Sequence, residues 1–237
     1  MIMDAASIRD YYQRVNLGTD LDGPRLMAEF DALKSASRVR RAASLVADAR
    51  GSFIDVGCGS GGLLYLLRDQ FDAMHGLDFA AAQLAKARTW ASQANASIAW
   101  HHVDLDRDGL PLPASSLDAA AALVLFELVV SPARALAEIH RVLRPEGIFV
   151  TSVGNVVSWR NRCRVLAGLD PRTTALAAAL NGGALHLFTK DTFVGLLTTA
   201  GFEIETVTCS GRWWQIRQWR PSLAAGDIMV RARKATR

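Results

Sequence analysis

The feature that most constrains this chain is the stretch from Phe53 to Gly62, in which an apolar run ends in a glycine-dense turn. The apolar segment Leu63–Leu67 follows the turn, so the order strand, tight turn, helix is predicted. Glycine adopts positive φ freely and lets a ligand approach the backbone. The first N–H groups of a helix are unpaired and carry the positive end of its dipole. The turn is therefore predicted to hold an adenosine-bearing ligand, with the carboxylate of Asp55 beside it.

The glycine spacing matches two ligand-binding patterns at once. Gly57, Gly59 and Gly62 satisfy the dinucleotide pattern G-x-G-x-x-G. Asp55, Gly57, Gly59 and Gly61 satisfy the pattern D-x-G-x-G-x-G of class I S-adenosylmethionine-dependent methyltransferases. A purely structural glycine turn in an α/β protein is a third interpretation. Other parts of the sequence are needed to distinguish these three interpretations.

An acidic residue follows at the position that both ligand-binding patterns require. Asp78 ends the predicted second strand, 19 positions after Gly59 (78 − 59 = 19). A carboxylate at this point binds ribose hydroxyls in dinucleotide-binding folds. Asp78 therefore supports an adenosine-bearing ligand without choosing between the two patterns.

Strands and helices alternate along most of the chain. Further strands are predicted at 98–103, 117–125, 148–153, 202–209 and 228–233. The run 117–125 is almost wholly apolar, as expected for a central parallel strand that is buried on both faces. The alternation predicts an α/β fold of the Rossmann-like, doubly wound type. The last two strands could pair antiparallel.

Two regions flank this core. Residues 1–50 are predicted to form an N-terminal helical cap, and residues 155–187 a helical insertion after strand five that acts as a mobile lid. Thr189 is predicted to cap the last helix. We interpret residues 1–237 as a single domain.

Composition excludes several classes of protein. The 27 Lys and Arg residues against 23 Asp and Glu give a net charge of +4, too small to imply a nucleic-acid partner. The three cysteines are far apart, without zinc or disulfide spacing, which suits a reducing cytosol. No signal peptide is apparent, and no apolar stretch approaches the roughly 20 residues of a membrane span. We therefore expect a cytoplasmic protein with no metal site and no transmembrane segment.

Two later motifs identify a family. The segment Arg141–Gly147 looks like the turn R-x-L-x-P-G-G before strand five of class I methyltransferases, with Glu146 at the first glycine. Ala200–Phe202 looks like the A-G-F that opens their sixth strand. Together with the glycine turn, these motifs make the chain resemble class I S-adenosylmethionine-dependent methyltransferases over nearly its whole length. The resemblance implies seven strands, mostly parallel with the last one antiparallel, and S-adenosyl-L-methionine as cofactor.

The second half of the chain is similar to MetW-type proteins and to related small-molecule and sugar methyltransferases. The matching segments are Asp104–Asp106, Trp159–Arg162 and His186–Thr189. The alanine-rich segment Thr173–Leu180 does not fit this pattern.

The resemblance assigns roles at the cofactor. It implies that Gly57, Gly59 and Gly61 line the methionine and ribose portion, and that Asp55 supports the turn.

The same resemblance implies that four further residues bind the nucleoside. Asp78 would bind the ribose hydroxyls, Phe79 would pack on adenine, and Asp104 with Leu105 would bind the adenine edge. Ribose hydroxyls and the adenine amine are donors and carboxylates are acceptors, so the chemistry agrees.

Methyl transfer to a hydroxyl needs alignment and, in addition, a general base. His186 is a candidate because it lies in the insertion expected to cover the strand ends. It could equally hold the start of the last helix. Glu127, at the end of strand four, is a second candidate base or a substrate hydrogen-bond partner.

Three tryptophans and three arginines gather between Arg212 and Arg220. Such a cluster can stack bases or lie at a membrane surface. The small net charge favours a packed hairpin or a subunit contact instead.

The predicted function is S-adenosylmethionine-dependent methylation of a small molecule, with a hydroxyl as acceptor. Two alternatives remain at this point. One is a MetW-like protein that binds the cofactor and acts through a partner enzyme, and the other is a nicotinamide-dependent oxidoreductase. A homodimer or a partner enzyme is compatible with the sequence.

Overall fold

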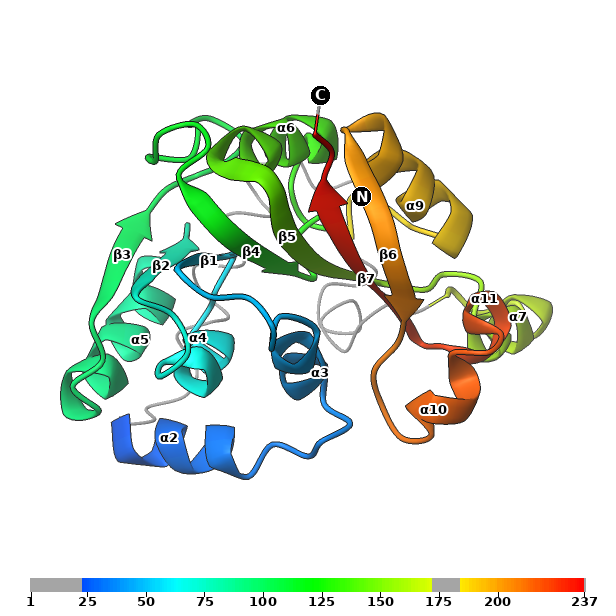
Figure 1. Cartoon of the computed structure of the whole chain (residues 1–237). Helices are drawn as coiled ribbons and strands as arrows, with labels where there is room; N and C mark the ends of the chain where they lie inside the picture. The colour runs from blue at the N-terminus through cyan, green and yellow to red at the C-terminus, as the bar shows by residue number, and fades with distance from the viewer. Residues whose placement is uncertain (1–22, 172–183, 237) are drawn as a thin grey trace.

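A seven-stranded sheet forms the centre of the computed structural model, which describes residues 23–171 and 184–236 (Figure 1). The strands are β1 Ser52–Val56, β2 Ala73–Asp78, β3 Ile98–His102, β4 Leu117–Leu123, β5 Leu143–Gly154, β6 Phe202–Thr208 and β7 Asp227–Lys234. Their order across the sheet is β3-β2-β1-β4-β5-β7-β6. Only β7 is antiparallel to its neighbours, β5 and β6. The predicted fold class and the antiparallel last strand are confirmed.

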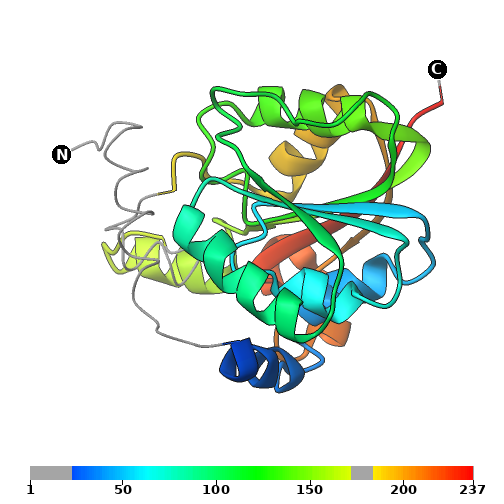
Figure 2. The same cartoon turned by 90° about the vertical axis from the view of Figure 1, so that its left-hand side faces the viewer.

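Helices cover both faces of this sheet. The helices are α2 Gly23–Asp31, α3 Arg38–Leu45, α4 Gly62–Leu67, α5 Ala81–Gln93, α6 Pro132–Val142, α7 Trp159–Leu166, α9 Lys190–Thr199, α10 Trp214–Arg217 and α11 Pro221–Ala224. Figure 2 shows α6 and α9 on one side of the sheet and α4 and α5 on the other. One apolar cluster fills each side, as a doubly wound sheet requires.

The side chains of strand β4 contribute to both apolar clusters. Ala120 and Ala122 belong to the cluster beneath α6 and α9, whereas Ala119 and Ala121 belong to the cluster on the opposite face. Successive strand side chains point to opposite faces, so an apolar run is buried twice. All four alanines have no exposed surface.

The predicted cap at Thr189 is present, and Ser131 caps α6 in the same way. The Ser131 hydroxyl accepts a hydrogen bond from the Arg134 N–H at 3.4 Å, and Pro132 follows in the first turn of α6. Thr189 caps α9 through a reciprocal pair of hydrogen bonds with Thr192. Both caps satisfy N–H groups that a helix start leaves without partners.

Strand β5 begins earlier than the predicted segment 148–153. Its pairing with β4 starts at Leu143, shifts register, and resumes at Ile148. Between them Glu146 adopts a φ of +63°, so the predicted turn is an irregularity within the strand.

Two predicted regions are only partly described. The N-terminal cap is described from Gly23 onward, and its residues 7–20 lie outside the described part. The insertion 155–187 contains α7, but its alanine-rich segment 173–180 also lies outside. The single domain, the cap and the lid stay predictions. Between β6 and β7 the chain forms α10 and α11.

Candidate functional site

A cavity of about 620 Å³ opens at the carboxyl ends of the parallel strands. Its walls come from the residues that follow β1, β2, β3 and β4, and from α2 and the start of α3. Open α/β sheets bind ligands at this edge because the loops there diverge to either side. Of the ten predicted site residues, seven line the cavity: Asp55, Gly57, Gly59, Asp78, Phe79, Asp104 and Leu105.

The glycine turn forms the floor of the cavity. Gly57 and Gly59 have φ values of +76° and +53°, which disfavour side chains. A Cβ placed on Gly59 would meet nothing within 4 Å, so this position faces open space. The N–H groups of Gly57 and Cys58 both donate to the Leu77 carbonyl, at 2.7 and 2.9 Å, and so fix the turn to β2.

Gly61 has a different environment from the other two glycines. It lies outside the cavity lining, with a φ of +83° just before α4. A Cβ there would lie 3.0 Å from Trp90 Cζ2. The Trp90 indole N–H also donates to the Ser60 carbonyl at 2.8 Å. Gly61 therefore permits α5 to pack beneath the turn, and Trp90 is a supporting residue that sequence reasoning missed.

Asp78 holds the turn from the end of β2. Its carboxylate accepts hydrogen bonds from the N–H groups of Gly59 and Ala80, each at 2.8 Å. Burial raises the pKa of Asp78, and these hydrogen bonds oppose the rise. The Asp78 carboxylate therefore lines the cavity next to the glycine turn, which is the position that the sequence predicts for it.

Asp55 is the most deeply buried acid of the site. Burial, and then the charge of Asp78, raises its pKa to about 7. Two carboxylates close together in a dry environment do not both ionise easily. At neutral pH Asp55 is therefore partly protonated.

The residues after β3 form one side of the cavity. Asp104 accepts a hydrogen bond from the Asp106 N–H at 3.1 Å, and its carboxylate lies 3.7 Å from Arg107 Nε. Asp106 in turn accepts from the N–H groups of Val130 and Ser131, at 2.8 and 3.2 Å. This wall is therefore attached to the loop that starts α6.

The opposite wall comes from the N-terminal cap. Glu29, Phe30 and Leu33 line it from α2 and the residues after it, and Arg38 and Val39 from α3. The Arg38 guanidinium lies 3.4 Å from an Asp227 carboxylate oxygen at the start of β7. The sequence predicts a helical cap over residues 1–50, but no motif in it indicates that α2 borders the site.

A strained residue shapes the end of β4. Val124 lines the cavity with a φ of +59°, which is rare for a β-branched side chain. Its N–H donates to the Ser152 carbonyl at 2.9 Å, which holds this conformation. The next residue, Leu125, would come within 3.1 Å of a Cβ on Gly57. No turn-forming residue in the sequence signals this bend.

The two predicted catalytic residues lie outside the cavity lining. The Glu127 carboxylate is buried and accepts a hydrogen bond from the Gly154 N–H at 2.9 Å, while its carbonyl accepts one from the Leu185 N–H at 2.8 Å. His186 Nε2 lies 3.2 Å from the Val130 carbonyl oxygen. Both residues join the end of the insertion to the segment after β4, and their catalytic roles stay predictions.

Metal sites and membrane-spanning helices are both absent from the described residues. Within 23–171 and 184–236, no group of three or more His, Cys, Asp or Glu side chains could hold a metal ion. No helix in these ranges is long and apolar enough to cross a membrane.

Comparisons with known proteins agree with this geometry. Residues 54–151 match the family model described as a methyltransferase domain. A Mycolicibacterium smegmatis protein described as a "probable S-adenosylmethionine-dependent methyltransferase" is 31% identical over 156 residues, or 64% of this chain and 52% of that protein. A malonyl-acyl-carrier-protein O-methyltransferase from Enterobacter lignolyticus is 32% identical over 95 residues, or 40% of this chain and 36% of that protein.

A solved structure shows the same fold. The S-adenosylmethionine-dependent methyltransferase from Mesorhizobium loti superposes with a TM-score of 0.63 at 24% identity, over 86% of this chain and 99% of that one. The chain spans about half the length, or less, of the curated relatives it matches. Residues 54–151 match a methyltransferase domain, and the predicted resemblance to class I S-adenosylmethionine-dependent methyltransferases is confirmed.

Proposed function

We propose that this chain binds S-adenosyl-L-methionine in the 620 Å³ cavity and methylates a small molecule at a hydroxyl group. The observation that carries the proposal is the position of two carboxylates. Asp78 ends β2, Asp104 follows the neighbouring strand β3, and both line one cavity with the open backbone of Gly59. An adenosine offers donors for both acids, and its ribose and amine are far enough apart to need two acceptors.

The lining fits the cofactor in three respects. Gly59 leaves open space where the ligand would meet the backbone. Phe79 offers an aromatic face in the same cavity. Arg38 places a guanidinium in the wall, and we assign it to the methionine carboxylate, because guanidinium and carboxylate make paired, charge-assisted hydrogen bonds.

Bound S-adenosyl-L-methionine supplies a methyl group on an electrophilic sulfonium. The chain's own part is to bind and orient the acceptor and to remove its proton when the acceptor is a hydroxyl. We assign the removal of this proton to His186. Glu127 holds in place the segment that carries His186. Glu127 serves this role through its bonds to Gly154 and Leu185.

The test of cofactor binding is calorimetric titration with S-adenosylhomocysteine and, separately, with NADH. The wild type is expected to bind the first and not the second. Asp78→Ala should weaken binding about 10–100-fold, the scale of roughly 1.5–3 kcal/mol for a hydrogen bond to a charged group. Asp72→Ala, an exposed carboxylate just before β2, is the matched control and should bind as wild type. Unchanged affinity in Asp78→Ala would remove this residue from the site.

The test of methyl transfer is release of S-adenosylhomocysteine during a screen of hydroxylated metabolites. On a confirmed hydroxyl acceptor, His186→Ala should reduce turnover by about 10²–10⁴-fold with unchanged cofactor affinity. A variant of wild-type stability and wild-type turnover would rule out the base role.

A second candidate is a MetW-like protein that binds the cofactor and acts through a partner enzyme. The observation that favours it is that both predicted catalytic residues lie outside the cavity lining. Tight binding of S-adenosylhomocysteine with no turnover on any acceptor, until a partner is added, would support it. In either case we propose that the protein works in the cytoplasm.

A further inference from the structure

The surface formed by residues 158–169 and 210–223, which we name the basic aromatic surface, differs from the rest of the protein. All but one of the large hydrophobic side chains that the described residues expose lie at 159–187 or 213–223, and Val130 is the exception. Trp219 is 84% exposed and Leu166 87%. Monomeric proteins rarely leave such side chains grouped in water, so a grouped set indicates an interaction surface.

The charge of this surface is of one sign. Six arginines lie in its two segments, with no lysine, aspartate or glutamate. They are Arg160, Arg162, Arg164, Arg212, Arg217 and Arg220. Among the described residues, none of the six forms an ion pair with an acidic side chain. No acidic side chain among the described residues therefore competes with an external anion for these arginines.

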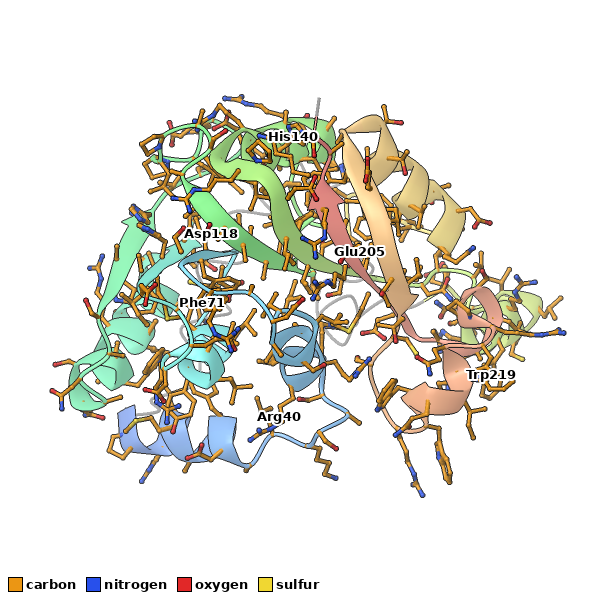
Figure 3. All side chains as sticks on the ribbon, viewed as in Figure 1. Arg40, Phe71, Asp118, His140, Glu205 and Trp219 are labelled. Carbon is orange, nitrogen blue, oxygen red and sulfur yellow. The ribbon has the colours of Figure 1, made fainter. Side chains whose placement is uncertain are left out.

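The two segments are joined by a buried asparagine. The Asn155 side-chain amide donates to the carbonyls of Pro221 and Ala225, at 3.1 and 2.9 Å, and the Asn155 backbone carbonyl accepts from the Asn161 side-chain amide at 3.1 Å. This links α11 to α7. Figure 1 shows α7, α10 and α11 at one end of the molecule, and Figure 3 shows Trp219 at its outer edge.

The tryptophans after β6 divide into one that packs and two that do not. Trp214 lies beneath the Arg41 guanidinium of α3, at 3.4 Å from its ring centroid. The Gly211 N–H donates to the Ala36 carbonyl at 2.7 Å, which fixes the start of this loop. Trp213, with a φ of +68°, and Trp219 are exposed instead. The packed hairpin favoured from the sequence therefore describes Trp214 only.

We infer that the basic aromatic surface docks on a bilayer that contains anionic phospholipids. Arginines attract anionic headgroups, and tryptophan is enriched at the level where headgroups meet acyl chains. A surface of basic residues with Trp and Leu is the composition that lies in this interface. A second copy of the chain fits less well, because a two-fold interface would bring these arginines against each other. The inference does not depend on the proposed methyl transfer.

The experiment is vesicle flotation of the full chain. Vesicles of phosphatidylcholine alone are compared with vesicles in which 30 mol% is phosphatidylglycerol, a composition of about three anionic lipids in ten. The wild type should float with the anionic vesicles only, and less so as salt shortens the range of the attraction. Arg212→Gln, Arg217→Gln and Arg220→Gln together should weaken partitioning roughly 100-fold, at about fivefold for each arginine. Trp213→Ala with Trp219→Ala should weaken it as well.

A matched variant removes the same charge elsewhere. Lys34, Arg50 and Arg88 are exposed on other elements, so changing all three to Gln should leave partitioning within a few-fold of wild type. An equal loss in this control, or equal flotation with neutral vesicles, would overturn the inference. So would a dimer seen by ultracentrifugation that the two Trp→Ala changes abolish while no vesicle binding occurs. If the Trp variant melts early, the arginine variant, in which Arg212 and Arg220 are exposed and Arg217 is half-buried, decides the question.

Discussion

At the scale of single residues, Asp55 gives the clearest pH dependence. Its pKa is about 7 in the folded protein against 3.8 in the unfolded chain, because burial and then the charge of Asp78 disfavour ionisation. Between about pH 4 and pH 7 the folded state keeps a proton that the unfolded state has lost. The contribution of Asp55 to stability therefore falls as pH rises through this window. Each pKa unit corresponds to roughly 1.4 kcal/mol, so the effect is on the order of a few kcal/mol.

Asp55→Asn tests this because asparagine cannot ionise. The difference in unfolding free energy between variant and wild type should shift in favour of the variant from pH 5 to pH 8. Urea unfolding at several pH values measures it. Asp72→Asn, at an exposed position, is the control and should follow the wild-type profile. Parallel profiles for Asp55→Asn and wild type would show that Asp55 ionises normally.

Glu146 occupies a glycine position in the motif that the chain resembles. Its φ of +63° is costly for any residue with a Cβ, by about 1 kcal/mol. Glu146→Gly should therefore raise the melting temperature by about 2–4 °C. Both this variant and Glu146→Ala lose the side-chain hydrogen bond to Thr236, but only glycine relieves the backbone. A melting temperature no higher in Glu146→Gly than in Glu146→Ala would contradict the strain argument.

At the scale of elements, the capping box of α9 is the test. Thr189 Oγ1 accepts from the Thr192 N–H at 3.2 Å, and the Thr189 N–H donates to Thr192 Oγ1 at 3.0 Å. Since α9 buries Phe193 and Leu197 completely, its start is coupled to the core. Thr189→Ala should cost about 1 kcal/mol of unfolding free energy. Thr198→Ala, which loses only a bond to the preceding turn at the exposed end of α9, should cost less than half of that.

At the scale of the whole molecule, Arg231 connects three distant parts of the chain. Its guanidinium donates to both carboxylate oxygens of Asp48, at 2.5 and 2.7 Å, to Glu205 at 2.5 Å, and to the Leu45 carbonyl at 2.6 Å. Glu205 lies on the outer strand β6 (Figure 3), and Asp48 follows α3. One cation therefore joins the segment before β1, the edge strand β6 and strand β7.

Arg231→Lys should lower the unfolding free energy by about 1–2 kcal/mol, because an ammonium cannot span this fork of acceptors. The measurement is urea unfolding, in which ionic strength stays constant. Arg68→Lys is the control for a surface arginine: Arg68 pairs with Asp69 at 3.6 Å, whose carboxylate is 87% exposed, and donates to the Tyr65 carbonyl at 2.7 Å. Exposed pairs contribute about 0–1 kcal/mol. Equal losses in the two variants would mean that the Arg231 cluster contributes no more than a surface pair.

Features that depend on neighbouring residues could be predicted from the amino-acid sequence. The glycine turn after β1, Asp78 at the end of β2, and the caps at Ser131 and Thr189 all follow from local backbone and hydrogen-bonding preferences. The alternation of apolar strands and helices then fixed the doubly wound sheet. These signals placed most of the proposed cofactor residues at one edge before any contact was known.

The residues that complete the cavity are brought there by long-range packing. Arg38 reaches it because α3 packs near the strand ends, and Trp90 supports the turn because Gly61 leaves room for it. Val124 bends there because Ser152, 28 residues later in the chain (152 − 124 = 28), accepts its N–H. Exposure of Trp213 beside a packed Trp214 likewise depends on Arg41. Each of these is a contact between residues far apart in sequence, and local backbone and hydrogen-bonding preferences do not predict such contacts.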